Sequence, residues 1–149
     1  MKKTFLFCLT LIASLLIFQG CSDKKGCTDS AADNYDSEAD EEDGTCIYVS
    51  INAYATHHGD TIINDSAYVD SLFVKFNATN LPGTDPSNYD LVKAGKAGED
   101  HVRIEGLKRG KYFIFMTGWD PHAGRVFGGI PIEIIQTSGT INLVVPVVE

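Results

Sequence analysis

The chain has 149 residues and is acidic, with 20 aspartates and glutamates against 12 lysines and arginines and a net charge of −8. A chain this negative is not expected to bind nucleic acid or an anionic membrane surface by charge. Residues 47–149 are enough for one domain with a hydrophobic core of its own.

The first 20 residues have the features of an export signal. Lys2 and Lys3 are followed by residues 4–18, which carry no charge. A basic start and an apolar run of about 7–15 residues are typical of a secretory signal peptide. The alternatives, a buried core helix or a true membrane anchor, fit less well. The run is shorter than the roughly 20 residues of a membrane-spanning helix.

Cys21 directly follows this segment. Residues 17–21, Ile-Phe-Gln-Gly-Cys, resemble the lipobox of bacterial lipoproteins, although Phe18 stands where that motif usually has leucine. The resemblance implies that residues 1–20 are removed and that Cys21 is lipidated. More than one acyl chain, as such lipoproteins carry, gives stable anchoring in a bilayer. Removal of residues 1–20 takes away two lysines and no acids, which changes the net charge from −8 to −10.

The remaining cysteines predict a disulfide. Cys8 would leave with the signal and Cys21 would be lipidated, so Cys27 and Cys46 remain as a pair. Two such cysteines in an exported protein are expected to join. Closing a loop of this length is expected to stabilise local order by roughly 3 kcal/mol.

We call residues 21–46 the collar. From residue 22 to residue 46 it contains nine acids, with Tyr35 as its main large apolar side chain. Without a cross-link such a segment is expected to be disordered, because it buries too little surface to offset its chain entropy. Its Cys-Thr-Asp at residues 27–29 and Asp-Gly-Thr-Cys at 43–46 resemble a short cysteine-bounded motif of secreted and surface proteins from Bacteroidota-type bacteria.

The collar also resembles, more loosely, the calcium loops of thrombospondin type 3 repeats. Calcium takes about 6–8 oxygen ligands, and closely spaced carboxylates and amides supply them. The candidate ligands are Asp29, Asn34, Asp36, Asp40 and Asp43. Their spacing does not match an EF-hand. The alternative is a solvated acidic spacer that keeps the domain clear of the lipid surface, with no cofactor.

Beyond the collar the chain alternates between strand and turn patterns. Apolar residues at every second position predict a strand from residue 47 to residue 54, followed by a turn at 57–60. Further strands are predicted, in chain order, at residues 67–76, 90–94, 101–105, 111–119, 126–135 and 141–148. Gly128 and Gly129 indicate a bulge or a close approach of two backbones. This spacing predicts an all-β fold, an antiparallel sandwich of seven strands.

One segment carries a family resemblance for the domain. Residues 106–112, Gly-Leu-Lys-Arg-Gly-Lys-Tyr, resemble the turn and strand of transthyretin-like and carboxypeptidase-regulatory-like domains. The resemblance implies a transthyretin/Ig-like sandwich in which Leu107 fills the core. His58 with residues 62–69, and residues 129–134, are similar to an uncharacterised lipoprotein family of that fold. It is a resemblance of fold rather than of function.

The four histidines, His57, His58, His101 and His122, are the candidate ligands for a transition metal. Zinc needs three or four ligands that converge. His57 and His58 are adjacent, so on a strand they are expected to face opposite sides. The alternative is a set of solvated turn histidines.

Aromatic residues give a further hypothesis. Trp119 and Tyr54, with Phe127, are candidates for stacking against a sugar or a peptide, and the alternative is that they pack within the fold. Asp-Ser/Thr-aliphatic triplets resemble the O-glycosylation sites of exported Bacteroidota proteins. They make Thr61, Ser66 and Ser71 candidate glycan acceptors.

The chain lacks the minimal motifs of metalloproteases, α/β-hydrolases and P-loop nucleotide-binding proteins. We therefore expect no enzyme, unless Asp120, His122 and a serine meet in a cleft. The leading interpretation is a lipoprotein anchored in the outer membrane through Cys21, on either face, with an envelope protein or a glycan as partner. A metal-binding or ligand-capturing lipoprotein is the alternative.

Overall fold

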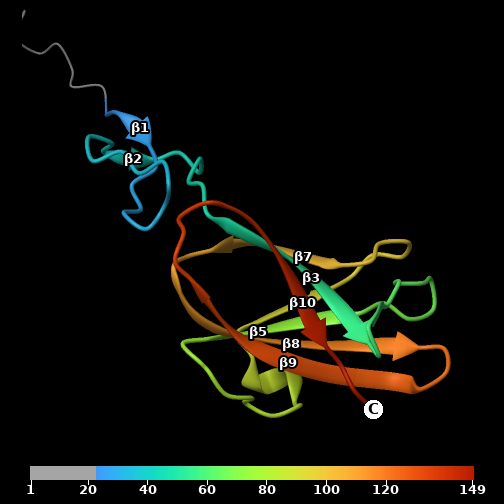
Figure 1. Ribbon diagram of the computed structural model, residues 1–149. Helices are drawn as coiled ribbons and strands as arrows, with labels where there is room; N and C mark the ends of the chain where they lie inside the picture. Colours follow the sequence, from blue (N-terminus) through green and yellow to red (C-terminus); the bar gives the residue numbers. More distant parts are fainter. Residues whose placement is uncertain (1–22) are drawn as a thin grey trace, which may run out of the picture.

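The structure is a computed structural model that describes residues 23–149. The collar stands at one end of a domain built from two four-stranded sheets (Figure 1). We call residues 47–149 the two-sheet domain. The regular secondary structure of the described residues consists of β-strands and one short 3-10 helix, η2 (Pro86–Asn88). The predicted all-β fold is confirmed.

The first sheet is centred on β3 (Val49–His57). One neighbour of β3 is β10 (Gly139–Pro146), and the other is β7 (Val102–Leu107), with the short β4 (Asp60–Thr61) at the end of β3. The β3–β7 and β3–β4 pairs are antiparallel. The β3–β10 pair is parallel, from Gly139 opposite Val49 to Pro146 opposite Thr56. The expectation of purely antiparallel pairing is therefore wrong for the first and last long strands.

The second sheet is antiparallel throughout and has the order β6-β5-β8-β9. Its strands are β5 (Ser71–Phe76), β6 (Leu91–Ala94), β8 (Gly110–Asp120) and β9 (Gly124–Ile134). The strand predicted at residues 67–76 begins later, because Asp65 accepts hydrogen bonds from the backbone of Ala67 and Tyr68 and holds that segment in a turn.

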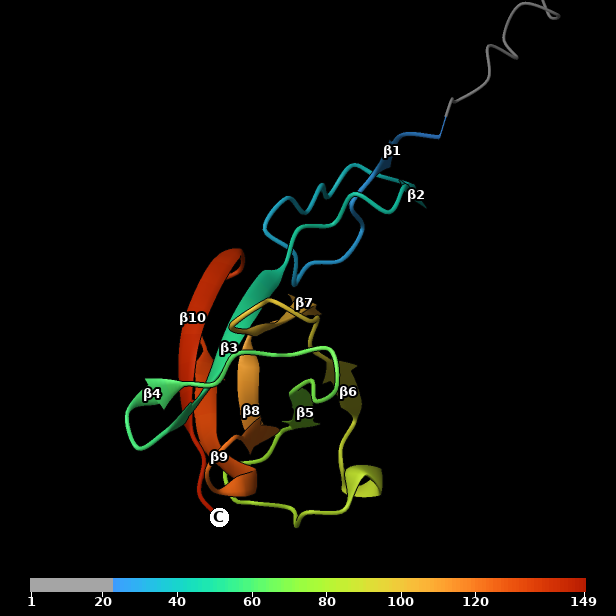
Figure 2. The ribbon, with the colours of Figure 1, turned by 90° about the vertical axis from the view of Figure 1, so that its right-hand side faces the viewer.

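The main core lies between the two sheets (Figure 2). Alternating residues of each strand point inward, as the period of two requires. Among those that are fully buried are Val49 and Ile51 of β3, Leu72 of β5 and Ile114 of β8. Leu107, at the end of β7, is also part of this core, so the leucine expected to fill the core does so.

The second sheet is covered on its outer face as well. Phe73, Tyr89, Phe113 and Phe115 form a separate buried cluster there. Tyr89 follows η2, and its hydroxyl donates a hydrogen bond of 2.7 Å to the carbonyl of Gly83. The segment between β5 and β6 thus covers β8, whose residues from Tyr112 to Met116 are all buried.

Gly128 and Gly129 permit two close approaches of the backbone. A methyl group at Gly128 would lie 2.2 Å from the carbonyl oxygen of Pro146, and one at Gly129 would lie 2.6 Å from that of Ile114. The β8–β9 register runs through both glycines without interruption. Of the two predicted possibilities, close approach is confirmed and the bulge is wrong.

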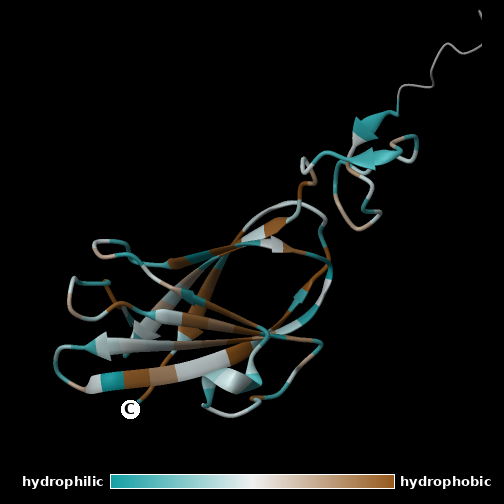
Figure 3. Cartoon of the chain, turned by 180° about the vertical axis from the view of Figure 1, so that it is seen from behind, coloured by the Kyte–Doolittle hydropathy of each residue, from teal (hydrophilic) through white to brown (hydrophobic). Residues whose placement is uncertain are grey.

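The collar has little regular structure. Its two short strands, β1 (Lys25–Gly26) and β2 (Glu41–Glu42), pair in parallel. The collar is mostly hydrophilic, whereas hydrophobic residues are concentrated along the strands of the two-sheet domain (Figure 3). Local order in the collar therefore depends on cross-links and polar contacts rather than on a core.

Candidate functional site

The predicted disulfide is present. Cys27 and Cys46 are bonded, with their Cα atoms 4.9 Å apart. Glu42 lies beside the bridge, and its carboxylate accepts hydrogen bonds from the backbone and the hydroxyl of Thr28. Cys27, Glu42 and Cys46 are close enough to be considered as metal ligands. Among the described residues, they are the one group of three or more histidines, cysteines or acids whose ligand atoms all lie within 4.8 Å of one another. The bonded sulfurs are not thiolates, the form in which cysteine binds metals.

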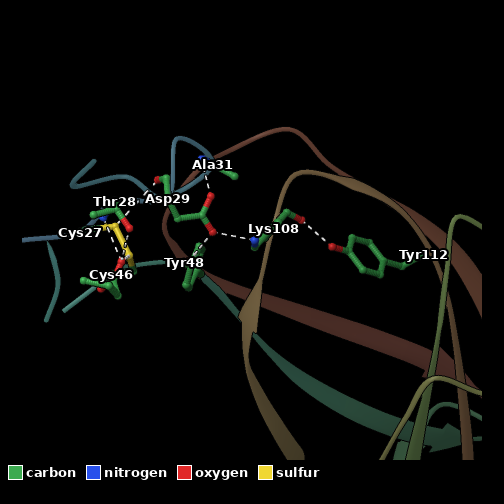
Figure 4. A network of polar contacts seen from close by, with 9 residues as sticks. Cys27, Thr28, Asp29, Ala31, Cys46, Tyr48, Lys108 and Tyr112 are labelled. Atoms are coloured by element: carbon green, nitrogen blue, oxygen red, sulfur yellow. Dashed lines mark hydrogen bonds and ion pairs between the residues drawn. A yellow bond between two sulfur atoms is a disulfide. The ribbon is translucent and has the colours of Figure 1, made fainter. Parts of the chain in front are cut away.

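Asp29 joins the collar to the two-sheet domain (Figure 4). Its carboxylate accepts a 2.6 Å hydrogen bond from the Tyr48 hydroxyl and pairs at 2.6 Å with the Lys108 ammonium. The carbonyl of Lys108 in turn accepts a hydrogen bond of 2.7 Å from the hydroxyl of Tyr112. The Lys108 ammonium beside Asp29 holds the pKa of that carboxyl well below its usual range. Asp29 is therefore a charged partner at this junction.

The other predicted calcium ligands have their partners among residues 24–47. Asn34 bridges the carbonyl of Thr45 and the amide of Ile47. Asp36 pairs with Lys24 at 2.8 Å, and Asp40 accepts from the backbone of the same lysine. Asp43 accepts from the backbone and the hydroxyl of Thr45. The structure does not bring these five side chains together, so a calcium ion would have to displace their present contacts.

Three of the four histidines gather at the opposite end of the two-sheet domain. A cavity of about 240 Å³ lies there between the end of β3, the β8–β9 turn and the C-terminal residue. We call it the histidine hollow, and it is lined by His57, His58, Asp60, Asp120, His122, Ala123 and Glu149. His101 lies elsewhere, against Tyr54 with ring centroids 5.4 Å apart.

His57 and His58 do not point to opposite sides, which corrects the expectation drawn from their adjacency. Their rings stack with centroids 4.1 Å apart and an angle of 20° between planes. The reason is the backbone of His58, which has a φ of +52° in the left-handed region. This conformation ends the strand and turns the second ring back over the first.

Asp120 organises the histidine hollow. One carboxylate oxygen lies 3.0 Å from Nδ1 of His57, and the other accepts hydrogen bonds from the backbone of His122 and Ala123. These backbone hydrogen bonds, with that from His57, lower the pKa of Asp120 to about 2. Asp120 and His122 do meet here, but none of the serines within residues 23–149 lines the hollow. The arrangement that would indicate a hydrolase is therefore incomplete.

The two predicted stacking residues lie on different surfaces. Tyr54 of β3 and Trp119 of β8 both point away from the core, and their strands belong to different sheets. Trp119 stacks instead on Tyr68, with ring centroids 4.3 Å apart. These two rings and Arg125 line a cavity of about 350 Å³ at the outer face of the second sheet. A platform shared by Tyr54 and Trp119 is thus excluded by the topology.

The three candidate glycan acceptors differ in exposure. Thr61 and Ser66 are exposed, and Ser71 is half-buried at the start of β5. Thr61 lies in β4, and Ser66 lies in the segment that leads to β5. The first two hydroxyls are accessible to a modifying enzyme, and glycosylation stays a prediction.

Sequence reasoning missed a buried polar pair, Asn64 and Asp70. Asp70 is fully buried, and neither of its carboxylate oxygens has a hydrogen-bond partner among the described residues. The side-chain oxygen of Asn64 accepts from the Asp70 backbone, and its amide donates to the carbonyl of Glu99. Burial raises the pKa of Asp70 to about 6. The alternation of Leu72 and Val74, extended back by one step, places Asp70 on the inner face.

Cys21, the expected lipidation site, lies outside the described residues together with the signal segment at residues 1–20. Within residues 23–149, no helix is both long and apolar enough to cross a membrane. A comparison of the chain with protein-family models, curated proteins and solved structures finds no match.

Proposed function

We propose that the chain is a lipid-anchored lipoprotein of the cell envelope, with a binding or structural role rather than a catalytic one. Cys21 would hold it in the outer membrane, and the collar would present the two-sheet domain to an envelope protein or a glycan. The main support for the proposal is the position of the collar in the chain and the contacts that order it. The collar begins at Cys21 and leads directly into the domain in sequence, is closed by a disulfide and is bonded to the domain through Asp29.

A signal peptide at residues 1–20 is part of the proposal. The disulfide supports it, because such bonds persist in oxidising compartments outside the cytosol. The acidic surface of the collar supports its role as a spacer, because nine acids within 25 residues near an anionic bilayer favour a position away from the lipid.

We assign the two-sheet domain to the transthyretin-like sandwiches as part of the same proposal. Two sheets enclosing one core and the buried Leu107 after the turn-forming segment support the assignment. A binding or structural role is favoured over hydrolysis, because the described lining of the histidine hollow offers no serine, threonine or cysteine nucleophile.

Membrane fractionation of the Cys21→Ala variant tests the anchor. Cys8→Ala is the matched control, because Cys8 lies in the segment that is removed. The wild type and the Cys8→Ala variant are expected to sediment with membranes, while the Cys21→Ala variant is expected in the soluble fraction. Sedimentation of the Cys21→Ala variant with membranes would overturn the proposal. Protease treatment of intact cells then shows which face the domain occupies, since only a surface-exposed domain is cut.

Capture of a sugar is a second candidate function, favoured by the exposed Tyr68–Trp119 pair beside Arg125. An aromatic ring can stack on a sugar ring, and the guanidinium of Arg125 can donate hydrogen bonds to sugar hydroxyl or carboxylate groups. Trp119 is the single tryptophan, so its fluorescence reports directly on this surface. A saturable change on titration with oligosaccharides is expected for the wild type and lost in the Tyr68→Ala variant. No change in the wild type would exclude the candidate.

A further inference from the structure

We propose that the histidine hollow binds one divalent transition-metal ion, with Nε2 of His57 as the fixed ligand and His58 and His122 as the ligands that close on it. This inference goes beyond the proposed lipoprotein function and does not depend on the lipid anchor. It names a ligand class for the end of the domain that lies away from the collar (Figure 1).

The first argument is the orientation of His57. Only 5% of this residue is exposed, and its Nδ1 lies 3.0 Å from the Asp120 carboxylate. A carboxylate can only accept a hydrogen bond, so in the neutral imidazole Nδ1 carries the hydrogen and Nε2 keeps a lone pair. Metal-binding histidines almost always donate their other ring N–H to a carboxylate or a carbonyl in this way.

The second argument is that the lone pair of His57 is available. Within residues 23–149, Nε2 accepts no hydrogen bond, and the residue lines the histidine hollow. Asp120 accepts hydrogen bonds from the backbone amides of His122 and Ala123, which hold it in place. It contacts the imidazole of His57 through Nδ1 and leaves Nε2 free to bind a metal ion. A buried imidazole that lines a cavity and has one ring nitrogen fixed by a carboxylate is preorganised to bind a metal ion.

The third argument is the set of exposed groups around the cavity. His58 lies over His57 with ring centroids 4.1 Å apart, and His122 and Asp60 lie on the neighbouring turn and strand. In the described structure, no three of the ligand atoms of the hollow lie within 4.8 Å of one another. His58, His122 and Asp60 are all exposed, so their side chains can change rotamer at small cost. Metal binding would therefore gather ligands around a fixed first histidine.

The strained backbone of His58 supports the same site. A non-glycine residue with a φ of +52° is uncommon and costs free energy. This conformation is what brings the second imidazole beside the first, whereas regular strand geometry would separate the two rings. The two-residue turn between β3 and β4 has a positive φ at both His58 and Gly59, so the site uses a conformation that this turn imposes.

The ligand chemistry selects the class of ion. Imidazole suits zinc, copper, nickel and iron, whereas calcium and magnesium prefer sites built from oxygen atoms alone. A site of three imidazoles with carboxylates beside them favours the first group. Asp60 and Glu149 would add negative charge next to the bound cation, which increases its affinity without requiring direct ligation.

Calorimetric titration of the full chain, purified in mild detergent, with zinc chloride tests the proposal. The His58→Gln/His122→Gln double variant removes two exposed ligands and leaves the buried pair of His57 and Asp120 intact. His101→Gln is the matched control, because His101 is a histidine outside the hollow. Any cysteine that binds zinc is the same in all three proteins. Circular dichroism confirms that each variant is folded.

The wild type and the His101→Gln variant are expected to bind one equivalent of zinc at the hollow. The double variant is expected to bind at this site at least tenfold more weakly, and calcium chloride is expected to give no heat there. Equal zinc binding by the wild type and the double variant would overturn the proposal, as would the absence of zinc binding by the wild type. Because the anchor is tested by fractionation, failure of one proposal is distinguishable from failure of the other.

Discussion

The carboxylate of Asp29 lies 2.6 Å from the ammonium of Lys108, and this ion pair joins the disulfide-closed collar to the turn between β7 and β8. Tyr48 donates to the same carboxylate, and the Lys108 ammonium lies 5.6 Å from the centre of the Tyr48 ring. The junction therefore contains one charge pair and one aromatic ring in mutual contact. Each partner comes from a different part of the chain.

Replacement of Lys108 by alanine is expected to loosen the collar without unfolding the domain. The change leaves Asp29 with its hydrogen bonds from Tyr48 and Ala31 but without its cationic partner. Amide hydrogen exchange should become faster in residues 27–46 and stay unchanged in β3 and β8. Lys93→Ala, on the exposed strand β6, is the control and should change neither region. Unchanged exchange in the collar of the Lys108→Ala variant would contradict the assigned role of the ion pair.

Removal of the disulfide by the Cys27→Ser/Cys46→Ser double change is expected to disorder the collar. The loss should be about 3 kcal/mol, the value expected for a closed loop of this size. None of the described collar residues, 23–46, belongs to the main core, so the two-sheet domain should stay folded. Limited proteolysis with mass spectrometry should find new cleavage sites in residues 27–46 alone. A double variant whose collar resists protease as well as the wild type would show that polar contacts are sufficient.

Asp70 is expected to make stability depend on pH. Its pKa is about 6 in the folded chain, raised from 3.8 by burial. Between these values the folded chain binds more protons than the unfolded chain, so the free energy of unfolding decreases as pH rises. The loss of stability caused by burying the ionised Asp70 is absent below about pH 3.8 and complete above about pH 6. There it amounts to about 3 kcal/mol, at 1.4 kcal/mol per pKa unit.

The Asp70→Asn variant should therefore be more stable than the wild type at pH 7, by up to about 3 kcal/mol, and the difference should vanish below pH 4. Denaturant unfolding at several pH values measures both effects. Asp100→Asn is the control, because Asp100 is exposed and its side chain pairs with His101 at the surface. An Asp70→Asn variant that is less stable than the wild type at pH 7 would mean that the charged form is stabilised in the fold.

Replacement of Gly128 by alanine is expected to destabilise the domain by about 1–3 kcal/mol, the usual cost of overpacking. The added methyl group would lie 2.2 Å from the carbonyl oxygen of Pro146, and the backbone there is held by hydrogen bonds between Phe127 and Val148. Thermal unfolding measures the loss. Glu133→Ala, an exposed change on the same strand, should leave the melting temperature nearly unchanged. Equal melting temperatures for the Gly128→Ala variant and the wild type would show that β9 and the C-terminal segment can separate without cost.

Much of the fold was predictable from local patterns. The alternation of Val49, Ile51 and Ala53 predicted β3, and the glycine-rich segment before Tyr112 predicted the turn into β8. The Cys27–Cys46 disulfide followed from the number and position of the cysteines. Each of these signals lies within a few residues or depends on a count, so no knowledge of the tertiary structure was needed.

Features that depend on contacts distant in sequence were not predictable. The parallel pairing of β3 and β10 joins segments about 90 residues apart, as with Asn52 opposite Asn142. The contact between His57 and Asp120 spans 63 residues. His57 and His58 stack because the backbone of His58 has a positive φ. The prediction from strand alternation assumed regular strand geometry at both residues. The predicted calcium ligands did not converge because each side chain has another partner, such as Lys108 for Asp29 and Lys24 for Asp36, and these partners are distant in sequence.

The parallel β3–β10 pair also has a mechanical consequence. The collar enters at the start of β3 and the chain leaves at the end of β10, so the two attachment points lie at opposite ends of adjacent strands. A force that pulls the collar one way and the far end of the domain the other way would shear the two strands past each other. The hydrogen bonds of all eight paired positions would then resist together instead of opening one by one. A domain held at the collar and loaded by a partner at its far end would be strongest along that axis.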